Sequence, residues 1–331
     1  MRSEEGHVGL IGLGAYTPDR IMTNDEWAAY VDTSDEWIRE RTGIEERRVA
    51  AEDQTTVDLA EQAARRALED AGMGVEEVDE IIVATDTPEV YIPDTSAYLQ
   101  DRLGAREVSA FDLAGSGCAG FLQALDVARS RILGGRQRVL VVGVELLTRL
   151  MNWQDRNTCV LFGDAAGAAV VARSPSAVEI VAATAGTDGS KAGVLCLETG
   201  GTRRPFSLEA AKLHLHQDIV MKGREVFKEA VGRMTQAARE VLREAGVALE
   251  KVALVVPHQA NHRIIEAVRK VLDLDVDKVF VNVHEYGNTG SASIPLALVE
   301  ARSTGRIHPG DLVLLTSFGA GFHWAATLLR F

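Results

Sequence analysis

The sequence predicts an α/β protein built from two similar halves, and three observations support this fold class. Apolar residues recur on one helical stripe from Val57 to Ala71, which indicates an amphipathic helix. Gly72 is a suitable C-cap residue for this helix. The apolar run EIIVAT at 80–85 has the length of a strand and a Pro-containing loop after it, so we expect a strand that is buried on both faces. The third observation is that this helix, turn and strand unit occurs twice.

The repeat aligns residues 62–78 with residues 236–252 without a gap, and nine of the seventeen positions are identical. At the same offset of 174, RVLVVG at 138–143 falls on LVLLTS at 312–317, and the helix after Cys118 falls on the helix after Ser291. We therefore predict two βα-rich halves, residues 1–173 and 174–331. No Pro-, Gly- or Ser-rich linker divides them, so we expect one rigid body with a site where they meet. Residues 186–216 lack clear periodicity and are predicted to be surface loops with short strands.

Composition narrows the class of protein. The chain has 331 residues, of which 46% are apolar and 25% charged, as in a folded soluble protein. A net charge of −13 argues against nucleic acid as a partner. The start MRSEEGHVGL lacks the basic and apolar regions of a signal peptide, and no apolar stretch approaches the ~18 residues of a membrane span, so we expect a cytoplasmic location. Three widely spaced cysteines without a Cys-x-x-Cys pair argue against a disulfide framework or a thiolate zinc site.

Cys118 is the first candidate catalytic residue. It lies between an apolar strand and a helix of about four turns, in a glycine-rich turn that contains Gly115, Gly117 and Gly120. A thiol at a helix N-terminus feels the positive end of the helix dipole, which lowers its pKa and favours the nucleophilic thiolate. The alternative is a small, inert core residue, because free cysteines are usually buried.

His258 and Asn288 are the second and third candidates. His258 follows a buried strand that stops at Pro257, and functional groups collect at strand ends in layered α/β folds; it could also be a loop histidine without a catalytic role. Asn288 lies in a glycine-rich turn, where it could donate to a developing oxyanion or simply suit the turn geometry. His258 and His262 are four residues apart, but the Glu of a His-Glu-x-x-His metal motif is missing. The glycine-rich turn in FGAGFHW offers backbone N–H groups for an oxyanion hole.

Two other motifs are set aside. Gly12-x-Gly14 lacks the third glycine of a dinucleotide-binding motif, and Pro18 follows where a helix should continue, so NAD binding is not expected. Residues 116–120 approach the nucleophile elbow of hydrolases, but position 116 is Ser instead of Gly and no Ser…Asp…His order is evident.

Together, GCAGF around Cys118, PHQANHRII around His258, YGNTGSASIP around Asn288 and the FGAGFHW turn resemble β-ketoacyl-acyl-carrier-protein synthase III of the thiolase superfamily. The resemblance includes VDTSDEWIRERTGIEERRVA and DRNTCVLFGDAAGAAVV and covers nearly the whole chain. It implies a five-layered αβαβα thiolase-like fold and a homodimer. It also implies that Cys118 takes an acyl group from acyl-CoA, that His258 and Asn288 stabilise the enolate formed from malonyl-acyl-carrier protein, and that the backbone N–H groups of Cys118 and Ala320 form the oxyanion hole. No metal or redox cofactor is implied.

The resemblance also assigns binding residues. Trp37 and Arg156 would sandwich the CoA adenine, and Thr33, Arg41, Phe227 and Asn261 would line the same tunnel. A basic patch beside the entrance would bind the acidic carrier protein: Lys228, Arg263, Arg269 and Lys270. An ordinary solvated face is the alternative for that patch, and a partly buried helix residue is the alternative for Trp37.

Several positions depart from the family pattern without removing a catalytic side chain. Gly117 replaces a usual Ala, Ala320 replaces a common Gly, and Gly290 stands where Ser or Ala is frequent. Ile92 occupies the position of a residue that reaches into the primer pocket of the partner subunit, so Ile92 and Gly117 are expected to shape primer preference, without indicating which primer.

Other functions compatible with this fold stay open. A synthase of secondary metabolism could condense an unusual starter or transfer acyl groups to oxygen or nitrogen, although a pure acyltransferase would not need both His258 and Asn288. A non-catalytic partner subunit would be expected to have lost Cys118. A cysteine hydrolase would release free acid from acyl-CoA without using malonyl-acyl-carrier protein.

Overall fold

The computed structural model describes residues 6–331. The first five residues, which include the acidic start weighed against a signal peptide, lie outside the described residues. The strands are β1 (His7–Tyr16), β2 (Ile21–Thr23), β3 (Glu46–Arg48), β4 (Glu80–Thr85), β5 (Ser109–Ala114), β6 (Arg138–Leu146), β7 (Asp164–Ser174), β8 (Val178–Thr187), β9 (Leu195–Leu197), β10 (Ile219–Met221), β11 (Leu254–Pro257), β12 (Leu312–Gly319) and β13 (His323–Arg330). The α-helices are α1 (Asn24–Trp27), α2 (Asp35–Thr42), α3 (Thr56–Asp70), α4 (Thr95–Leu103), α5 (Gly120–Leu133), α6 (Leu208–Lys212), α7 (Gly223–Ala245), α8 (His262–Val271), α9 (Val283–Tyr286) and α10 (Ser293–Ser303).

The main strands follow the order β11-β12-β13-β8-β1-β7-β6-β4-β5. The first half contributes β5-β4-β6-β7-β1 and the second half β8-β13-β12-β11, and the two sets join where Gly9 and Leu10 pair with Glu179 and Val178. Strand β4 runs parallel to β5 and β6, and β11 runs parallel to β12, while the other neighbours are antiparallel. Parallel strands need both faces covered, which fits the complete burial of β4.

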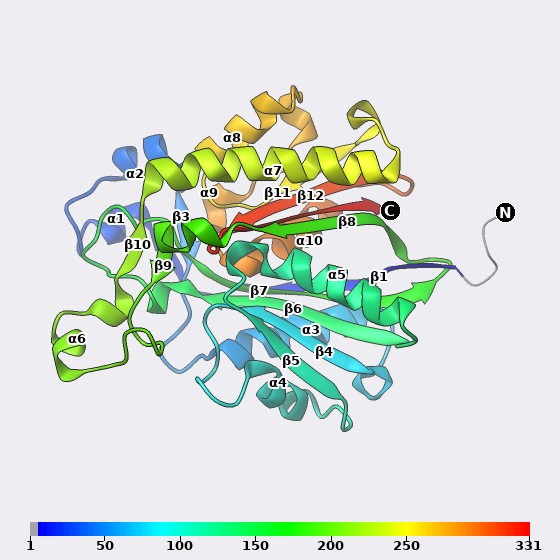
Figure 1. Cartoon of the computed structure of the whole chain (residues 1–331), viewed down its shortest axis with the longest axis horizontal. Helices are drawn as coiled ribbons and strands as arrows, with labels where there is room; N and C mark the ends of the chain where they lie inside the picture. Colours follow the sequence, from blue (N-terminus) through cyan, green and yellow to red (C-terminus); the bar gives the residue numbers. More distant parts are fainter. Residues whose placement is uncertain (1–5) are drawn as a thin grey trace.

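Helices cover the outer faces of the two strand sets and also lie between the sets, so the chain forms five layers. Helix α3 packs on β1, β7 and β6 from outside, and α7 packs on β13, β12 and β8 from the opposite outside. Helices α5 and α10 lie between the two strand sets, and α5 contacts strands of both. Figure 1 shows α7 above the second set, α5 in the middle and α3 and α4 below the first set. The expected αβαβα architecture is confirmed.

The internal repeat is also visible in the backbone. Helix α3 matches the predicted helix within one residue at each end, and α7 is its counterpart. Gly72 after α3 and Gly246 after α7 both have a φ of 65°, the left-handed conformation that ends a helix. Glu80 pairs with Val139 as Leu254 pairs with Val313, again at an offset of 174. The boundary between residues 173 and 174 falls on the last residues of β7.

Local sequence explains why the elements begin and end where they do. Thr55 and Asp58 form a capping box at the start of α3, in which each side chain accepts from the other residue's backbone N–H. The stretch 186–216 contains the end of β8, the short strand β9 and the five-residue helix α6, so the loop prediction holds for most of it and misses that helix. Among the described residues, no helix is both long and apolar enough to span a membrane.

Candidate active site

Cys118 lies in a single 3₁₀ turn, η2 (Gly117–Ala119), that connects β5 to α5. Gly117 adopts a φ of 54°, and a Cβ at that position would lie 2.6 Å from the backbone N of Ala320. Conversely, a Cβ at Gly319 would lie 2.4 Å from the backbone N of Cys118. These two contacts bring the Cys118 turn and the turn after β12 together, so the N–H groups of Cys118 and Ala320 are neighbours.

The environment of the Cys118 thiol differs from the expectation of a lowered pKa. Burial raises the pKa of this thiol, and the negative charge of the neighbouring Asp86 raises it further. These effects outweigh the dipole of α5, because the thiol is withdrawn from water and faces acidic groups. The resting residue is therefore a thiol at neutral pH, and its Sγ lies 3.9 Å from Oδ1 of Asn288.

His258 lies at the end of β11, as predicted, with 2% of its surface exposed. Its backbone N–H donates to the carbonyl of Thr316, and its Nδ1 lies 2.6 Å from Oγ of Ser293. Burial lowers the pKa of His258 to about 3, so the imidazole is neutral at physiological pH. When the Ser293 hydroxyl donates to Nδ1, the imidazole carries its hydrogen on Nε2 and can donate from there.

Asn288 is fixed by its backbone on both sides. Its N–H donates to the carbonyl of Leu161, and its carbonyl accepts from the N–H of Gly163. Its side-chain Oδ1 accepts from the N–H of Gly290 at 2.9 Å and also lies beside the Cys118 thiol. The Gly290 N–H fixes the orientation of the side-chain amide, so the opposite end, Nδ2, is the group that can donate to a ligand.

The residues expected to bind CoA lie in α2 and the loop before it, in the loop before β7, in α7 and at the N-cap of α8. The Arg156 guanidinium lies 4.6 Å from the ring centroid of Trp37, and that of Arg41 lies 4.7 Å from it. Asn261 caps α8 by accepting from the N–H of Arg263, and its Nδ2 donates to the Arg41 carbonyl. The Thr33 hydroxyl is buried without a hydrogen-bond partner in the part of the chain that the structure describes, which leaves it able to bind a ligand.

The expected carrier-protein residues do not form a uniform patch. Arg263, Lys270 and Lys228 are exposed on α8 and α7. Arg269 pairs with Glu266 at 2.6 Å and donates to the carbonyl of Leu274, and Lys270 lies 3.4 Å from the same carboxylate. Arg269 therefore stabilises its own helix and turn, and its charge is largely neutralised. Phe227 is partly exposed on α7, next to Lys228.

The structure contains a polar cluster next to Cys118 that the sequence did not predict: Asp86, Thr87, Glu145 and Ser291. Glu145, at the end of β6, accepts from the hydroxyl of Thr87 and contacts Oγ of Ser291, each at 2.9 Å. Asp86 accepts from the N–H of Gly117, at 3.3 Å. The sequence signal for this cluster is the polar Asp86-Thr87 pair directly after the strand EIIVAT, together with a glutamate inside the apolar run VVGVELL.

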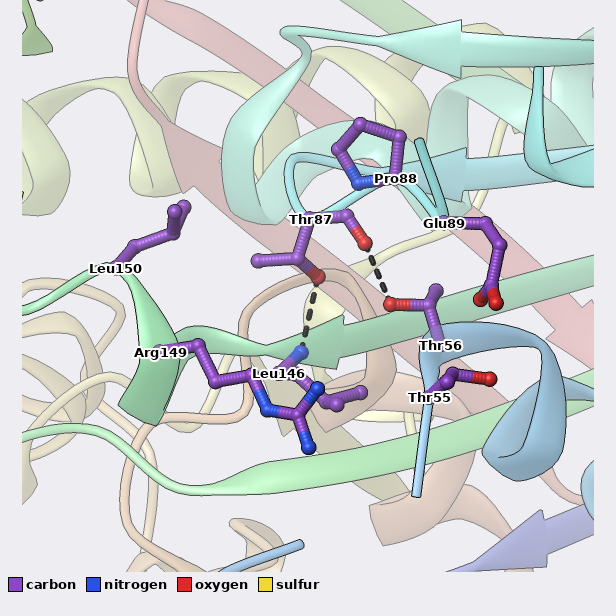
Figure 2. A pocket seen from close by; sticks show the side chains of 8 residues that line it. All are labelled: Thr55, Thr56, Thr87, Pro88, Glu89, Leu146, Arg149 and Leu150. Carbon is purple, nitrogen blue, oxygen red and sulfur yellow. Dashed lines mark hydrogen bonds between the residues drawn. The ribbon is translucent and has the colours of Figure 1, made fainter. Parts of the chain in front are cut away.

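Thr87 also forms part of a cavity of about 280 Å³, whose wall consists of Thr55, Thr56, Thr87, Pro88, Glu89, Leu146, Arg149 and Leu150. Figure 2 shows Thr87 in the wall, where its carbonyl accepts from the hydroxyl of Thr56 and its own hydroxyl accepts from the N–H of Leu146. Thr87 thus separates this cavity from the polar cluster. Within residues 6–331, no group of three or more His, Cys, Asp or Glu is placed to hold a metal ion.

The five-layered duplicated fold and the site between its halves define an acyl-transferring enzyme of the thiolase-like class. Comparison with protein families matches residues 111–189 to 3-oxoacyl-[acyl-carrier-protein] synthase III and residues 242–331 to the C-terminal part of the same enzyme. The chain belongs to the β-ketoacyl-[acyl-carrier-protein] synthase III family, and it is a condensing enzyme.

Individual relatives support this assignment. The β-ketoacyl-[acyl-carrier-protein] synthase III of Caldanaerobacter subterraneus is 48% identical over 97% of both chains. The crystal structure of 3-oxoacyl-[acyl-carrier-protein] synthase III from Aquifex aeolicus is 46% identical, with a TM-score of 0.89 over 98% of this chain and 100% of the other. The priming β-ketosynthase of the R1128 polyketide pathway is 36% identical, with a TM-score of 0.89 over 100% of this chain and 98% of the other.

Proposed function

We propose that this enzyme initiates fatty acid synthesis by condensing an acyl-CoA primer with malonyl-acyl-carrier protein, through an acyl group held on Cys118. Two observations carry the proposal: the Cys118 thiol lies 3.9 Å from Oδ1 of Asn288, and the buried neutral imidazole of His258 contacts Ser293, the first residue of the helix that follows the Asn288 turn. The thiol can form the acyl thioester, and the amide and the imidazole can donate hydrogen bonds to an enolate. The backbone N–H groups beside the thiol can donate to an oxyanion.

In the first half-reaction, the sulfur of Cys118 attacks the acyl carbonyl and the thiol proton leaves with the sulfur of CoA. The step forms one thioester bond and breaks another, so no net charge is created in the buried site. The neighbouring N–H groups of Cys118 and Ala320 are proposed to hold the oxyanion of the tetrahedral intermediate.

In the second half-reaction, the malonyl thioester loses carbon dioxide and becomes an enolate. Nε2 of His258 and Nδ2 of Asn288 are proposed to donate to the enolate oxygen, and the buried site makes both hydrogen bonds stronger than in water. The carbanion then attacks the acyl-Cys118 carbonyl, and the expelled thiolate takes up one proton. Thiol, imidazole, amide and backbone N–H groups suffice for this sequence, with acyl-CoA and malonyl-acyl-carrier protein as substrates and no further cofactor.

The adenine of CoA is proposed to bind between Trp37 and Arg156, with Thr33, Arg41, Phe227 and Asn261 along the tunnel. The two stacking partners are 4.6 Å apart, which leaves no room for a base between them. Binding must therefore move Arg156 and break its hydrogen bond to the carbonyl of Asp32.

The carrier protein is proposed to bind at Lys228, Arg263, Arg269 and Lys270. Arg269 and Lys270 share the carboxylate of Glu266, and the closer and less exposed Arg269 is expected to contribute least. The net charge of −13 would otherwise repel an acidic partner, so exposed cations beside the entrance would steer its approach.

A homodimer is proposed from the free edge of β5, which ends the main sheet. Exposed sheet edges and apolar side chains are normally covered. Tyr91 is 76% exposed and Ile92 is 82% exposed, and Tyr98 is exposed on α4 close by in sequence. A second copy of this chain would cover these side chains, and Ile92 together with Gly117 would then shape the primer pocket. A cytoplasmic location is proposed with this role.

The first test is to incubate the protein with acyl-CoA and to locate the acyl group by peptide mass spectrometry. One acyl group on the Cys118 peptide, absent in Cys118→Ser and retained in Cys196→Ser, supports the proposal. Cys196 is a suitable control because it is also a partly buried free thiol. Free acid without an acyl-protein adduct would instead point to hydrolysis.

A second candidate function is the priming of a secondary-metabolite pathway, which is favoured by the similarity to the R1128 priming β-ketosynthase. A panel of primers separates the two functions. A preference for acetyl-CoA or a short branched acyl-CoA favours fatty acid synthesis, whereas exclusive use of an unusual starter or transfer to oxygen or nitrogen favours the second candidate.

A further inference from the structure

Glu145 is a buried carboxyl group for which the proposed reaction provides no role. It lies at the end of β6, and its residue is 1% exposed. Its side chain lies between the two halves, since it contacts Ser291 of η8 (Gly290–Ala292) and the residues that follow β4. A Cβ at Gly290 would lie 2.7 Å from Cγ of Glu145, so glycine at that position permits the approach.

The hydrogen bonds around Ser291 determine the protonation state of this carboxyl group. Oγ of Ser291 lies 2.9 Å from the carbonyl oxygen of Ala84 and 2.9 Å from Oε1 of Glu145. A hydroxyl has one hydrogen, and a carbonyl can only accept. If Glu145 were a carboxylate, one of these two short contacts would join two acceptors without a hydrogen. Both are satisfied when Glu145 donates to Ser291 and Ser291 donates to Ala84.

The other carboxyl oxygen has donors of its own. Thr87 N–H donates to the hydroxyl of Thr85 at 3.0 Å, and the Thr85 and Thr87 hydroxyls lie 3.3 Å apart. With Thr85 donating to Thr87, the Thr87 hydroxyl donates to Oε2 of Glu145 at 2.9 Å. The N–H of Asp86 points between the two oxygens, at 3.1 Å from Oε2 and 3.2 Å from Oε1. The Thr87 hydroxyl therefore makes Oε2 the acceptor end of the group, and the contact with Ser291 makes Oε1 the donor end.

We propose that Glu145 is a neutral carboxylic acid with its proton on Oε1, and that it is the positioning residue that fixes the turn of Cys118 against the turn of Ser291. Glu145 holds the backbone of Asp86, and the Asp86 carboxylate accepts from the N–H of Gly117, next to the nucleophile. A chain of hydrogen bonds therefore leads from Ser291 through Glu145 and Asp86 to the turn of Cys118. Because Glu145 is neutral, it takes part in this chain without adding a second negative charge beside the thiol.

The surrounding charges agree with a single proton on Glu145. Complete burial, followed by the charge of Asp86, raises the pKa of Glu145 well above its ordinary value. The other titratable groups that face the pair are Cys118 and His323. Burial raises the pKa of Asp86 as well, but the N–H groups of Gly117 and Gly115, and then His323 on β13, act to lower it. Of the two carboxyl groups, Asp86 therefore carries the negative charge.

The direct test measures the pKa of the Cys118 thiol from the pH dependence of its alkylation by iodoacetamide, with the Cys118 peptide quantified by mass spectrometry. Glu145→Gln should leave this pKa within about 0.3 units, because it replaces one neutral group by another of the same shape. Asp86→Asn should lower it by a unit or more, because it removes the charge. A fall of a unit or more in Glu145→Gln would overturn the neutral assignment. This test uses no substrate, so it can fail or succeed independently of the proposed reaction.

A second measurement tests the positioning role and rests on the proposed function. Glu145→Ala should lower kcat at least 10-fold with little change in KM, and Glu145→Gln should restore most of that loss, because Gln also accepts on one side and donates on the other. An equal loss in both variants would contradict a neutral positioning group. If Glu145→Ala does not fold, the free energies of unfolding of Glu145→Gln and of the unchanged protein should be compared as a function of pH. The unchanged protein should lose stability relative to Glu145→Gln as pH rises above about 4.5, because a carboxyl group whose pKa is raised in the folded state destabilises the fold in that range.

Discussion

Cys118 and Ser291 occupy equivalent positions in the two halves of the molecule. Each is the middle residue of a 3₁₀ turn that precedes a central helix, and each follows a glycine in the left-handed conformation, Gly117 with a φ of 54° and Gly290 with a φ of 55°. The partners of the two turns differ. Glu145 faces the turn of Ser291, whereas the equivalent position in the other half is Gly319, which approaches the N–H of Cys118. One copy of the duplicated turn thus contacts a carboxyl group, and the other contacts only the backbone of a glycine.

The close approach at Gly319 leads to the first prediction. Gly319→Ala should lower kcat by about 10²- to 10³-fold, the usual effect of losing one oxyanion-hole donor, because the new Cβ would push against the N–H of Cys118. Steady-state kinetics and thermal unfolding should be measured together. Gly189→Ala is the matched control, since a Cβ there meets nothing within 4 Å. Equal kinetics in both variants would exclude the proposed oxyanion hole.

The contact between Ser293 and His258 gives the second prediction. Ser293→Ala should lower kcat about 2- to 10-fold, because the imidazole loses the hydrogen bond that selects its Nε2–H form, a loss of ~0.5–1.5 kcal/mol. Acyl transfer to Cys118 should stay close to normal, since only decarboxylation uses the imidazole. Ser303→Ala, at the far end of α10, provides the control. A selective defect in acyl transfer would show that His258 acts in the other half-reaction.

The buried imidazole also predicts a pH dependence of stability. The pKa of His258 is about 3 in the folded protein and about 6.5 in an unfolded chain, so the unfolded state binds more protons between these values. The free energy of unfolding should therefore fall as pH decreases from 6.5, by up to ~1.4 kcal/mol per pH unit from this residue. Denaturant unfolding at pH 5 and pH 7 should show a smaller difference in His258→Gln. An unchanged difference would mean that the imidazole is not held neutral.

The stacked pair on the surface predicts a selective effect on CoA binding. Trp37→Ala should raise KM for acyl-CoA about 5- to 150-fold, which corresponds to ~1–3 kcal/mol of base stacking. Arg156→Ala should have a smaller effect, because Arg156 must first leave the Trp37 ring. Acyl-pantetheine, which lacks the adenine, is the control substrate, and its KM should not change. A similar rise for both substrates would remove the adenine from this site.

Much of the fold could be predicted from the sequence, because the repeat is long and the buried strands are nearly all apolar. The α3 helix, strand β4 and the offset of 174 were confirmed in the structure, as was the position of His258 at a strand end. These features depend on short-range periodicity, which the sequence records directly. Helix α6 was missed, since five residues are too few to show a helical period.

The electrostatics of the site could not be predicted in the same way. The thiol pKa was expected to be lowered by the helix dipole, but burial beside Asp86 raises it. That residue follows β4 and is 32 positions away from Cys118 in the sequence. The binding role of Arg269 stays a prediction, and its ion pair with Glu266 three residues earlier was indicated by helical spacing, whereas its bond to the carbonyl of Leu274 was not. Both differences arise from contacts of particular side chains and not from secondary structure.

In the proposed reaction, Cys118 holds the acyl group and His258 is needed only for the condensation that follows. This division is tested by supplying acyl-CoA and malonyl-acyl-carrier protein to the unchanged protein, Cys118→Ala and His258→Ala, and by following both acyl-enzyme and β-ketoacyl-carrier protein. Both products are expected in the unchanged protein, neither in Cys118→Ala, and acyl-enzyme without condensation product in His258→Ala. Condensation product in Cys118→Ala, or none in the unchanged protein across the primer panel, would contradict the proposed reaction.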